Sequence, residues 1–385
     1  MNNLTFSISF IILTTICRAQ SVSPNLKTIS IEKDEDYSGY ELIEPGDNQL
    51  FVLAERWHNI RLVPRATMKL LKYLHKEANV RVLAIEQGNS AAYMINRYLS
   101  NGDTVILRQI ARNTMFWGQE NWAFFQDLYE FNQSISESER VSVQSIDIEY
   151  KMESAIFVIN ELINNREIPA TLINTVGTFY QLFEDNRFHR EQFEGLAIMY
   201  YYDKELVTNL VRYTLADMRE QKEVYKKYFG DDFNQFATTI KEMDEGLIFD
   251  YTNPNTNYKF RDRLIQKKFM DLLTNHSDKG ILCVIGMRHA TKGSSLFKLN
   301  AEAESPVNNK VMNIRICGLY NKAFRTSDLK RINFTYPGQL RDNDATLIKH
   351  DMSDPTLRSK LLDYTLFINN GESLTPFKNT LKEGY

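Results

Sequence analysis

The sequence has little of the residues that interrupt regular structure. Its 385 residues include 16 glycines and 9 prolines, about 4% and 2% of the chain. An average protein holds about 7% and 5% of these residues. Few turn-forming residues favour long elements, mostly helices, over a β-sandwich of many short strands.

The sequence also lacks an excess of charge of either sign. Lysine and arginine number 46 and aspartate and glutamate 49, which gives a net charge of -3. Because a nucleic-acid backbone is neutralised by a basic surface, a nucleic-acid partner is not expected. Hydrophobic residues at 43% and charged residues at 25% are typical of a globular chain and exclude wholesale disorder.

A single long apolar run stands at the N-terminus, over Phe6–Ile16. It is too short to span a bilayer, which takes about 20 apolar residues. Small residues at Cys17 and Ala19 favour cleavage after Ala19. We therefore expect a signal peptide over 1–19, an exported protein that is periplasmic or secreted, and no transmembrane segment in the mature chain. A buried first strand is the alternative interpretation of this run.

Cysteine is scarce as well. Removal of residues 1–19 leaves Cys283 and Cys317, each inside an apolar run of strand length. Two cysteines are too few for a disulfide framework or a four-cysteine zinc site. We expect both to be buried as small hydrophobic residues.

Apolar runs separated by helical stretches predict an α/β fold with a mostly parallel sheet and helices on both faces. The first unit is the clearest, because Pro64 suits a first helical turn and Val63, Ala66, Leu70 and Leu74 recur at helical spacing. The expected strands are Leu50–Ala54, Val80–Ile85, Val141–Ile148, Ile281–Ile285, Val311–Cys317 and Tyr364–Ile368.

The region from about 152 to 250 contains no apolar run of strand character. Leu206, Leu210 and Tyr213 are spaced to share one helical face. We interpret the region as a helical insertion that packs over the sheet and roofs the cleft at the strand ends. Residues 20–46 are expected to be an irregular lead-in, and 47–385 a single α/β domain of catalytic type.

Ionisable residues follow three of the predicted strands. Glu55 and His58 come after the first, Glu86 after the second, and His289 after the strand that begins at Ile281. Ligands of open parallel sheets bind at the carboxyl ends of strands. Histidine exchanges protons near neutral pH, and neighbouring carboxylates orient it, so this group suits activation of water. Taken singly, either histidine could cap a helix and Glu86 could pair with an arginine.

Several catalytic motifs are absent from the sequence. It contains no Gly-x-Ser-x-Gly elbow, no Walker A loop, no Gly-x-Gly-x-x-Gly after a strand and no His-Glu-x-x-His. No nucleophile for covalent catalysis stands out, and no cofactor is expected. General-base chemistry on water is the remaining prediction.

The chain resembles the erythromycin esterase-like family of the EreA/ChaN-like superfamily. The resemblance rests on short segments in order along the chain: Ala54-Glu55-Arg56-Trp57-His58, Ala84-Ile85-Glu86-Gln87-Gly88, Gln144-Ser145-Ile146-Asp147, Phe260-Arg261-Asp262-Arg263 and Gly286-Met287-Arg288-His289-Ala290. The sequence departs from the family pattern at Ala54, Trp57 and Gly286.

The resemblance implies hydrolysis of an ester or lactone in a small molecule, without a metal ion. His58 would be the general base, oriented by Glu55 or Glu86. His289 and Arg261 would stabilise the developing oxyanion or the leaving group. The residues expected to contact substrate are Asp147, Arg61, Arg65 and Trp57.

Two alternatives stay open at this point. Glu55, His58, Glu86 and His289 could ligate a divalent ion, or the chain could bind haem, as other members of the superfamily do. The chain could also be a non-catalytic exported ligand-binding protein, which the departures at Trp57 and Gly286 would suit.

Overall fold

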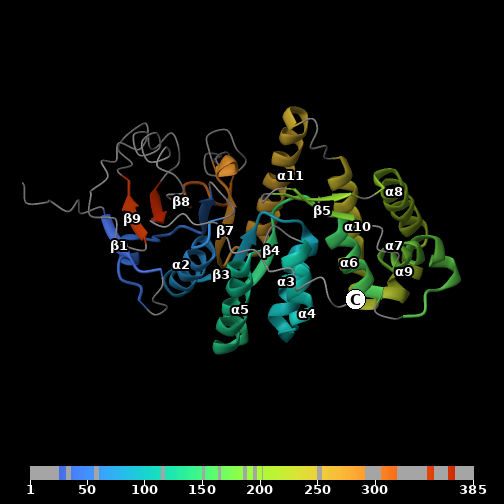
Figure 1. The fold of residues 1–385 in the computed structure, drawn as a ribbon, viewed down its shortest axis with the longest axis horizontal. Coiled ribbons are helices and arrows are strands. Elements are labelled where there is room, and N and C mark those ends of the chain that lie inside the picture. The colour runs from blue at the N-terminus through green and yellow to red at the C-terminus, as the bar shows by residue number, and fades with distance from the viewer. Residues whose placement is uncertain are drawn as a thin grey trace, which may run out of the picture.

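The centre of the molecule is an eight-stranded mixed sheet with the order β1-β9-β10-β8-β2-β7-β3-β4 (Figure 1). The computed structural model describes residues 26–31, 36–55, 60–113, 118–149, 152–163, 166–184, 189–193, 197–201, 203–248, 254–290, 305–318, 345–350 and 363–368. The strands are β1 (Leu26–Ile29), β2 (Leu50–Glu55), β3 (Val80–Ile85), β4 (Ser142–Ser145), β7 (Gly280–Gly286), β8 (Val311–Gly318), β9 (Ala345–Lys349) and β10 (Tyr364–Ile368).

The sheet is mostly parallel, as the sequence predicts. Strand β2 runs parallel to β7 and β8, β3 runs parallel to β7 and β4, and β10 runs parallel to β8. Antiparallel pairing joins β9 to β1 and to β10. All six expected strands are present, with β4 shorter than its apolar run.

Two strands of the sheet escaped prediction. The edge strand β1 lies within the expected irregular lead-in over 20–46, which was wrong for Leu26–Ile29. Its Lys27 and Thr28 are exposed and Ile29 is buried, so no apolar run marks it. Strand β9 has only five residues. Its two large apolar residues, Leu347 and Ile348, lie between a threonine and a lysine. Strands of four and five residues are too short for an apolar pattern to stand out in the sequence.

Helices cover both faces of the sheet, as expected. One face packs against α2 (Val63–Glu77), α3 (Asn89–Asn101), α4 (Thr104–Asn113) and α5 (Gln119–Ser134), and the other against α11 (Pro254–Asn275). Alternation along β2 divides the core, since Phe51 and Leu53 join the first layer and Val52 joins the α11 layer. Cys283 and Cys317 are buried, as predicted.

The region from about 152 to 250 is largely helical. It contains α6 (Met152–Ile163), α7 (Thr178–Glu184), α8 (Lys204–Glu220), α9 (Lys222–Phe229) and α10 (Phe233–Ile248). The expectation that no strand interrupts it was wrong, because β5 (His189–Phe193) pairs antiparallel with β6 (Ala197–Tyr201). The polar residues of β5 give no apolar run, and a three-residue connection makes the pairing a local one.

The buried face of α8 also differs from the expected one. Val207, Leu210 and Val211 are buried with Thr214, whereas Tyr213 is 53% exposed. The expected stripe therefore lay about one residue away from the true one. Leu210 lies on the expected face and on the observed one, so its spacing from its neighbours did not distinguish the two.

The helical insertion lies beside the sheet. Helices α6 and α10 contact α3, and α6 also contacts α4. Figure 1 shows the group α6–α10 beyond β4, at the end of the molecule opposite β1 and β9. Helices α2, α3 and α5 cover the sheet face next to these helices, and the expectation that the insertion packs over the sheet stays a prediction. None of the described helices is long and apolar enough to cross a membrane.

Gly246 of α10 packs against the backbone that follows β4. A Cβ atom at this position would lie 1.8 Å from the backbone oxygen of Glu149. In an ordinary helix interior, replacement of glycine by alanine stabilises by about 1 kcal/mol. At Gly246 the close contact makes the same replacement destabilising.

We predict that Gly246→Ala lowers the free energy of unfolding by about 1–3 kcal/mol, because overpacking forces the backbones apart. Urea unfolding measures this change. Lys241→Ala, on the exposed side of the same helix, is the control and should change stability by less than about 0.5 kcal/mol. An increase in stability for Gly246→Ala would contradict the close contact.

Candidate active site

The carboxyl ends of four neighbouring parallel strands bring ionisable residues together. Glu55 ends β2, Glu86 directly follows β3, and Asp147 follows β4 by two residues. His289 lies in η6 (Met287–Ala290), the short helix directly after β7. Because β2, β7, β3 and β4 are adjacent and parallel, all four residues lie at one edge of the sheet.

Arg261, near the N-terminal end of α11, joins two of these residues. Its Nε donates to Asp147 Oδ1 at 2.8 Å, and its Nη2 donates to Asp147 Oδ2 and, at 2.8 Å, to Glu86 Oε1. The Asp147 side chain is fully buried and that of Arg261 is 12% exposed. The planar guanidinium thus binds one carboxylate at two points and still reaches a second.

His289 lies between two carboxylates. Its Nδ1 is 3.0 Å from Asp262 Oδ1, and its Nε2 is 3.3 Å from Glu86 Oε1. Burial lowers the pKa of His289, but hydrogen bonds to Asp262 and Glu86 raise it further, to about 9. His289 is therefore an imidazolium at neutral pH and donates from both nitrogens.

Glu86 receives three donors. Arg261 and His289 both approach Oε1, and the backbone N–H of Gly286 donates to Oε2. Two cations and a backbone amide fix its orientation. Glu86 is thus an anchored carboxylate in the wall of a pocket.

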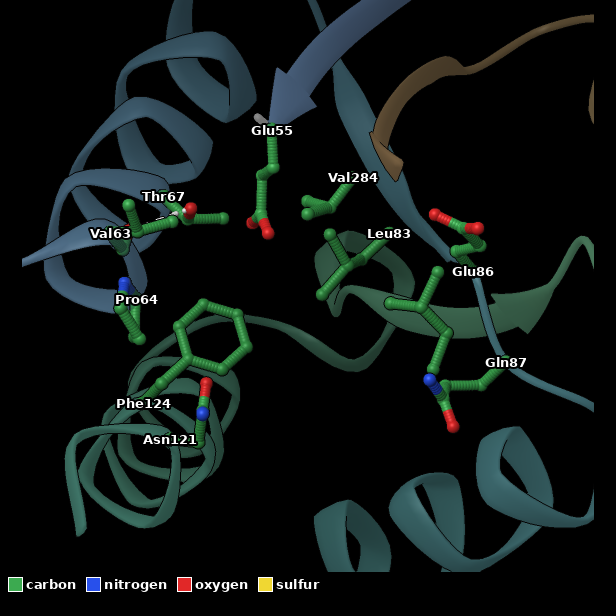
Figure 2. A pocket seen from close by; sticks show the side chains of 11 residues that line it. Glu55, Val63, Pro64, Thr67, Leu83, Glu86, Gln87, Asn121, Phe124 and Val284 are labelled. Carbon is green, nitrogen blue, oxygen red and sulfur yellow. Dashed lines mark hydrogen bonds between the residues drawn. The ribbon is translucent and has the colours of Figure 1, made fainter. Parts of the chain in front are cut away.

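This pocket lies between the strand ends and helices α2 and α5. It encloses about 630 Å³ of empty space, its open mouth included. Figure 2 shows Glu55, Phe124 and Asn121 on one side of it and Glu86 and Gln87 on the other. The described lining is mostly apolar and comprises Glu55, Val63, Pro64, Thr67, Leu83, Ile85, Glu86, Gln87, Asn121, Phe124 and Val284. None of these residues belongs to the insertion. Within the described lining, the pocket is covered by α2 and α5, whereas residues 152–250 were expected to cover it.

Other polar residues near the site were not predicted. Lys268 of α11 donates to Glu242 Oε2 of α10 at 2.7 Å and to the backbone oxygen of Asp147. Glu149 is buried and accepts from the backbone N–H of Ser90 at 2.8 Å. Burial raises the pKa of Glu149 to about 7. The sequence offered one signal for Glu149, because it lies two residues after Asp147 and just beyond the same strand.

The remaining predicted residues lie elsewhere or outside the described part of the chain. Arg61 forms an ion pair with Glu120 of α5, at 3.5 Å between Nε and Oε1. Arg65 is exposed on α2. His58 and Trp57 fall within 56–59, outside the described residues, so their roles stay predictions. Among the described residues, no group of three or more His, Cys, Asp or Glu side chains is arranged to hold a metal ion.

Comparison with known proteins identifies the fold. No family model and no curated protein sequence matches this chain. A solved Bacillus cereus protein aligns over 87% of this chain and 91% of its own, with 15% identity and a TM-score of 0.59. A mutant of erythromycin esterase EreC in its open conformation aligns over 90% and 98%, with 12% identity and a TM-score of 0.57. A succinoglycan biosynthesis protein aligns over 91% and 94%, with 13% identity and a TM-score of 0.58.

The raised pKa of His289 predicts a pH-dependent stability. A pKa that rises from 6.5 to about 9 on folding corresponds to about 3 kcal/mol. Because the folded pKa is the higher one, this stabilisation is complete below about pH 6.5 and is lost as the pH rises through 9. His289→Gln should therefore be less stable than the unmutated chain by about 3 kcal/mol at pH 6, and the difference should shrink towards pH 9.

Urea unfolding of both proteins at a series of pH values measures the difference. His276→Gln is the control, because burial lowers the pKa of His276. The stability difference for that variant should not shrink between pH 6.5 and 9. A pH-independent difference for His289→Gln would show that His289 is not charged in the folded protein.

Arg261 should be the most costly residue of the site to neutralise. Arg261→Gln leaves the buried carboxylate of Asp147 without its cation, and breaking a buried ion pair costs about 3–5 kcal/mol. Arg263→Gln removes the same charge from an exposed position two residues along α11 and should cost less than about 0.5 kcal/mol. Equal losses of unfolding free energy for the two variants would contradict the assigned pairing.

Proposed function

Because the chain shares the fold of the erythromycin esterase-like proteins, we propose that it is a hydrolase for an ester or lactone of a small molecule. The reaction would take place in the pocket at the strand ends, by activation of water without a metal ion. The observation that carries this proposal is the anchored carboxylate of Glu86, held between Arg261 and His289 in the wall of a mostly apolar pocket.

His58 is the proposed general base. It follows Glu55 by three residues, and three residues of extended chain reach about 10 Å. The proposal takes His58 to reach the pocket that Glu55 and Glu86 line. Its neutral imidazole would take a proton from water while the water oxygen forms a bond to the ester carbonyl carbon. The proton would then pass to the alkoxide oxygen as the ester bond breaks.

Glu55 and Glu86 are the proposed partners of that histidine. A carboxylate beside an imidazole orients the ring and stabilises the imidazolium that forms as the proton is taken. Arg261 and His289 would act as positioning residues that keep Glu86 ionised and in place. The N–H groups of Arg261 and His289 are directed at carboxylates, which favours this role over direct contact with the oxyanion.

We further propose that the mature protein is exported to the periplasm or secreted, with a small molecule as its substrate. The support is the apolar run Phe6–Ile16 followed by Cys17 and Ala19, all outside the described residues. Sequencing the N-terminus of the protein recovered from the producing cells tests this. A mature chain that begins at Gln20 is the expected result, and an intact Met1 would contradict it.

The proposed roles predict a bell-shaped dependence of kcat/KM on pH. The acidic limb should have a midpoint near 6.5, where an unperturbed histidine loses its proton, and the alkaline limb a midpoint near 9, where His289 does. A panel of neutral esters and lactones, assayed with and without EDTA, measures both limbs. His58→Ala should lower kcat by about 10²–10⁴-fold.

His289→Gln should retain the acidic limb and lose the alkaline one. Turnover abolished by EDTA would overturn the metal-free mechanism, and full activity of His58→Ala would overturn the assignment of the base. Arg263→Gln is the control that should leave both limbs unchanged, since Arg263 is exposed away from the cluster.

A further inference from the structure

Gln87 is a buried pocket residue whose side-chain donor has no partner among the described residues. It lines the pocket, is 1% exposed, and its Nε2 makes no hydrogen bond within the part of the chain that the structure describes. A buried donor without an acceptor is costly, and native structures rarely keep one without a reason. A ligand in the pocket that offers an acceptor to this amide would remove the cost.

Backbone hydrogen bonds fix the main chain of Gln87. The Gln87 N–H donates to Ile85 O at 2.8 Å, and the Gln87 oxygen accepts from Asp147 N at 3.3 Å. The next residue, Gly88, packs so closely on Glu149 that a Cβ atom would lie 2.6 Å from its carboxyl group. Gln87 is thus held between the ends of β3 and β4, and ordering it on binding costs little entropy.

The rest of the lining limits what the amide can meet. The described walls are mostly apolar, from Val63, Leu83, Ile85, Phe124 and neighbouring residues. The ionisable side chains among the described lining residues are the carboxylates Glu55 and Glu86, which disfavour an anion. A second amide, Asn121, lies across the pocket from Gln87 (Figure 2).

From these observations we infer that Gln87 determines substrate specificity. It donates a hydrogen bond to a neutral acceptor oxygen on an otherwise apolar group of the substrate. The preferred ligands are uncharged molecules with such an oxygen, and anions and pure hydrocarbons bind less well. This inference rests on the proposed function, since it takes the pocket to be the substrate site.

Three benzene derivatives of similar size test the inference without any hydrolysis. Acetophenone has a neutral acceptor oxygen, isopropylbenzene has none, and benzoate is an anion. Ligand-observed NMR titration gives a Kd for each. The unmutated protein should bind acetophenone about tenfold or more tightly than isopropylbenzene, as expected when the alternative leaves a buried donor unpaired. Benzoate should bind most weakly.

Gln87→Leu removes the donor while keeping a similar volume. It should weaken acetophenone binding by about tenfold and strengthen isopropylbenzene binding, which inverts the preference. Gln126→Leu makes the same change on the exposed side of α5 and should leave all three Kd values unchanged. If Gln87→Leu does not fold, the ranking of the three probes by the unmutated protein still decides.

Equal binding of acetophenone and isopropylbenzene, tightest binding of benzoate, or an unchanged preference in Gln87→Leu would each overturn the inference. The outcome is separable from the proposed function. If the probes rank as expected but no ester is hydrolysed, the function fails and the specificity of the pocket stands. If esters are hydrolysed but the probes do not bind in the expected order, the proposed function stands and the inferred role of Gln87 fails.

Discussion

The ion pairs of Arg261 are the interaction on which the strand-end site depends. Asp147 is fully buried, and burial of a carboxylate is costly unless a cation or several donors stabilise it. Arg261 supplies that cation from α11, on the other face of the sheet from α2 and α3. The same guanidinium reaches Glu86, so it joins the ends of β3 and β4 to a helix far along the chain. The site therefore forms only when α11 is packed on the sheet.

Charges alternate around this arginine. Acidic and basic side chains form a row in which each contacts the next. The order is Asp262, His289, Glu86, Arg261 and Asp147. Each cation lies between carboxylates, which explains why the pKa of His289 rises although burial alone would lower it. Glu149 is the contrasting case. No ion pair joins it to a described cation, and burial raises its pKa to about 7.

Much of the sheet could be predicted from the sequence, because buried parallel strands such as Val80–Ile85 are nearly continuous apolar runs. Glu86 and His289 could be located because they directly follow such runs. The hairpin β5–β6 and the true face of α8 could not, since β5 is polar and a shift of one position still keeps Leu210 on the stripe. Asp262 and Lys268 depend on how α11 rotates on the sheet, which periodicity does not specify. Their partners lie in distant segments that only the tertiary fold brings near.

The insertion contributes to the site without lining the described pocket. Glu242 of α10 binds Lys268, which also donates to the backbone of Asp147, so α10 is joined to the residue that Arg261 holds. On the same helix, the missing side chain of Gly246 lets α10 reach the backbone of Glu149. Glu149 in turn receives the N–H of Ser90 and packs on Gly88, next to Gln87. Through these contacts the packing of α10 fixes the loop after β3, which carries both the anchored carboxylate and the amide that faces the pocket. A substitution in the insertion can thus alter the geometry of the pocket without contacting any ligand in it.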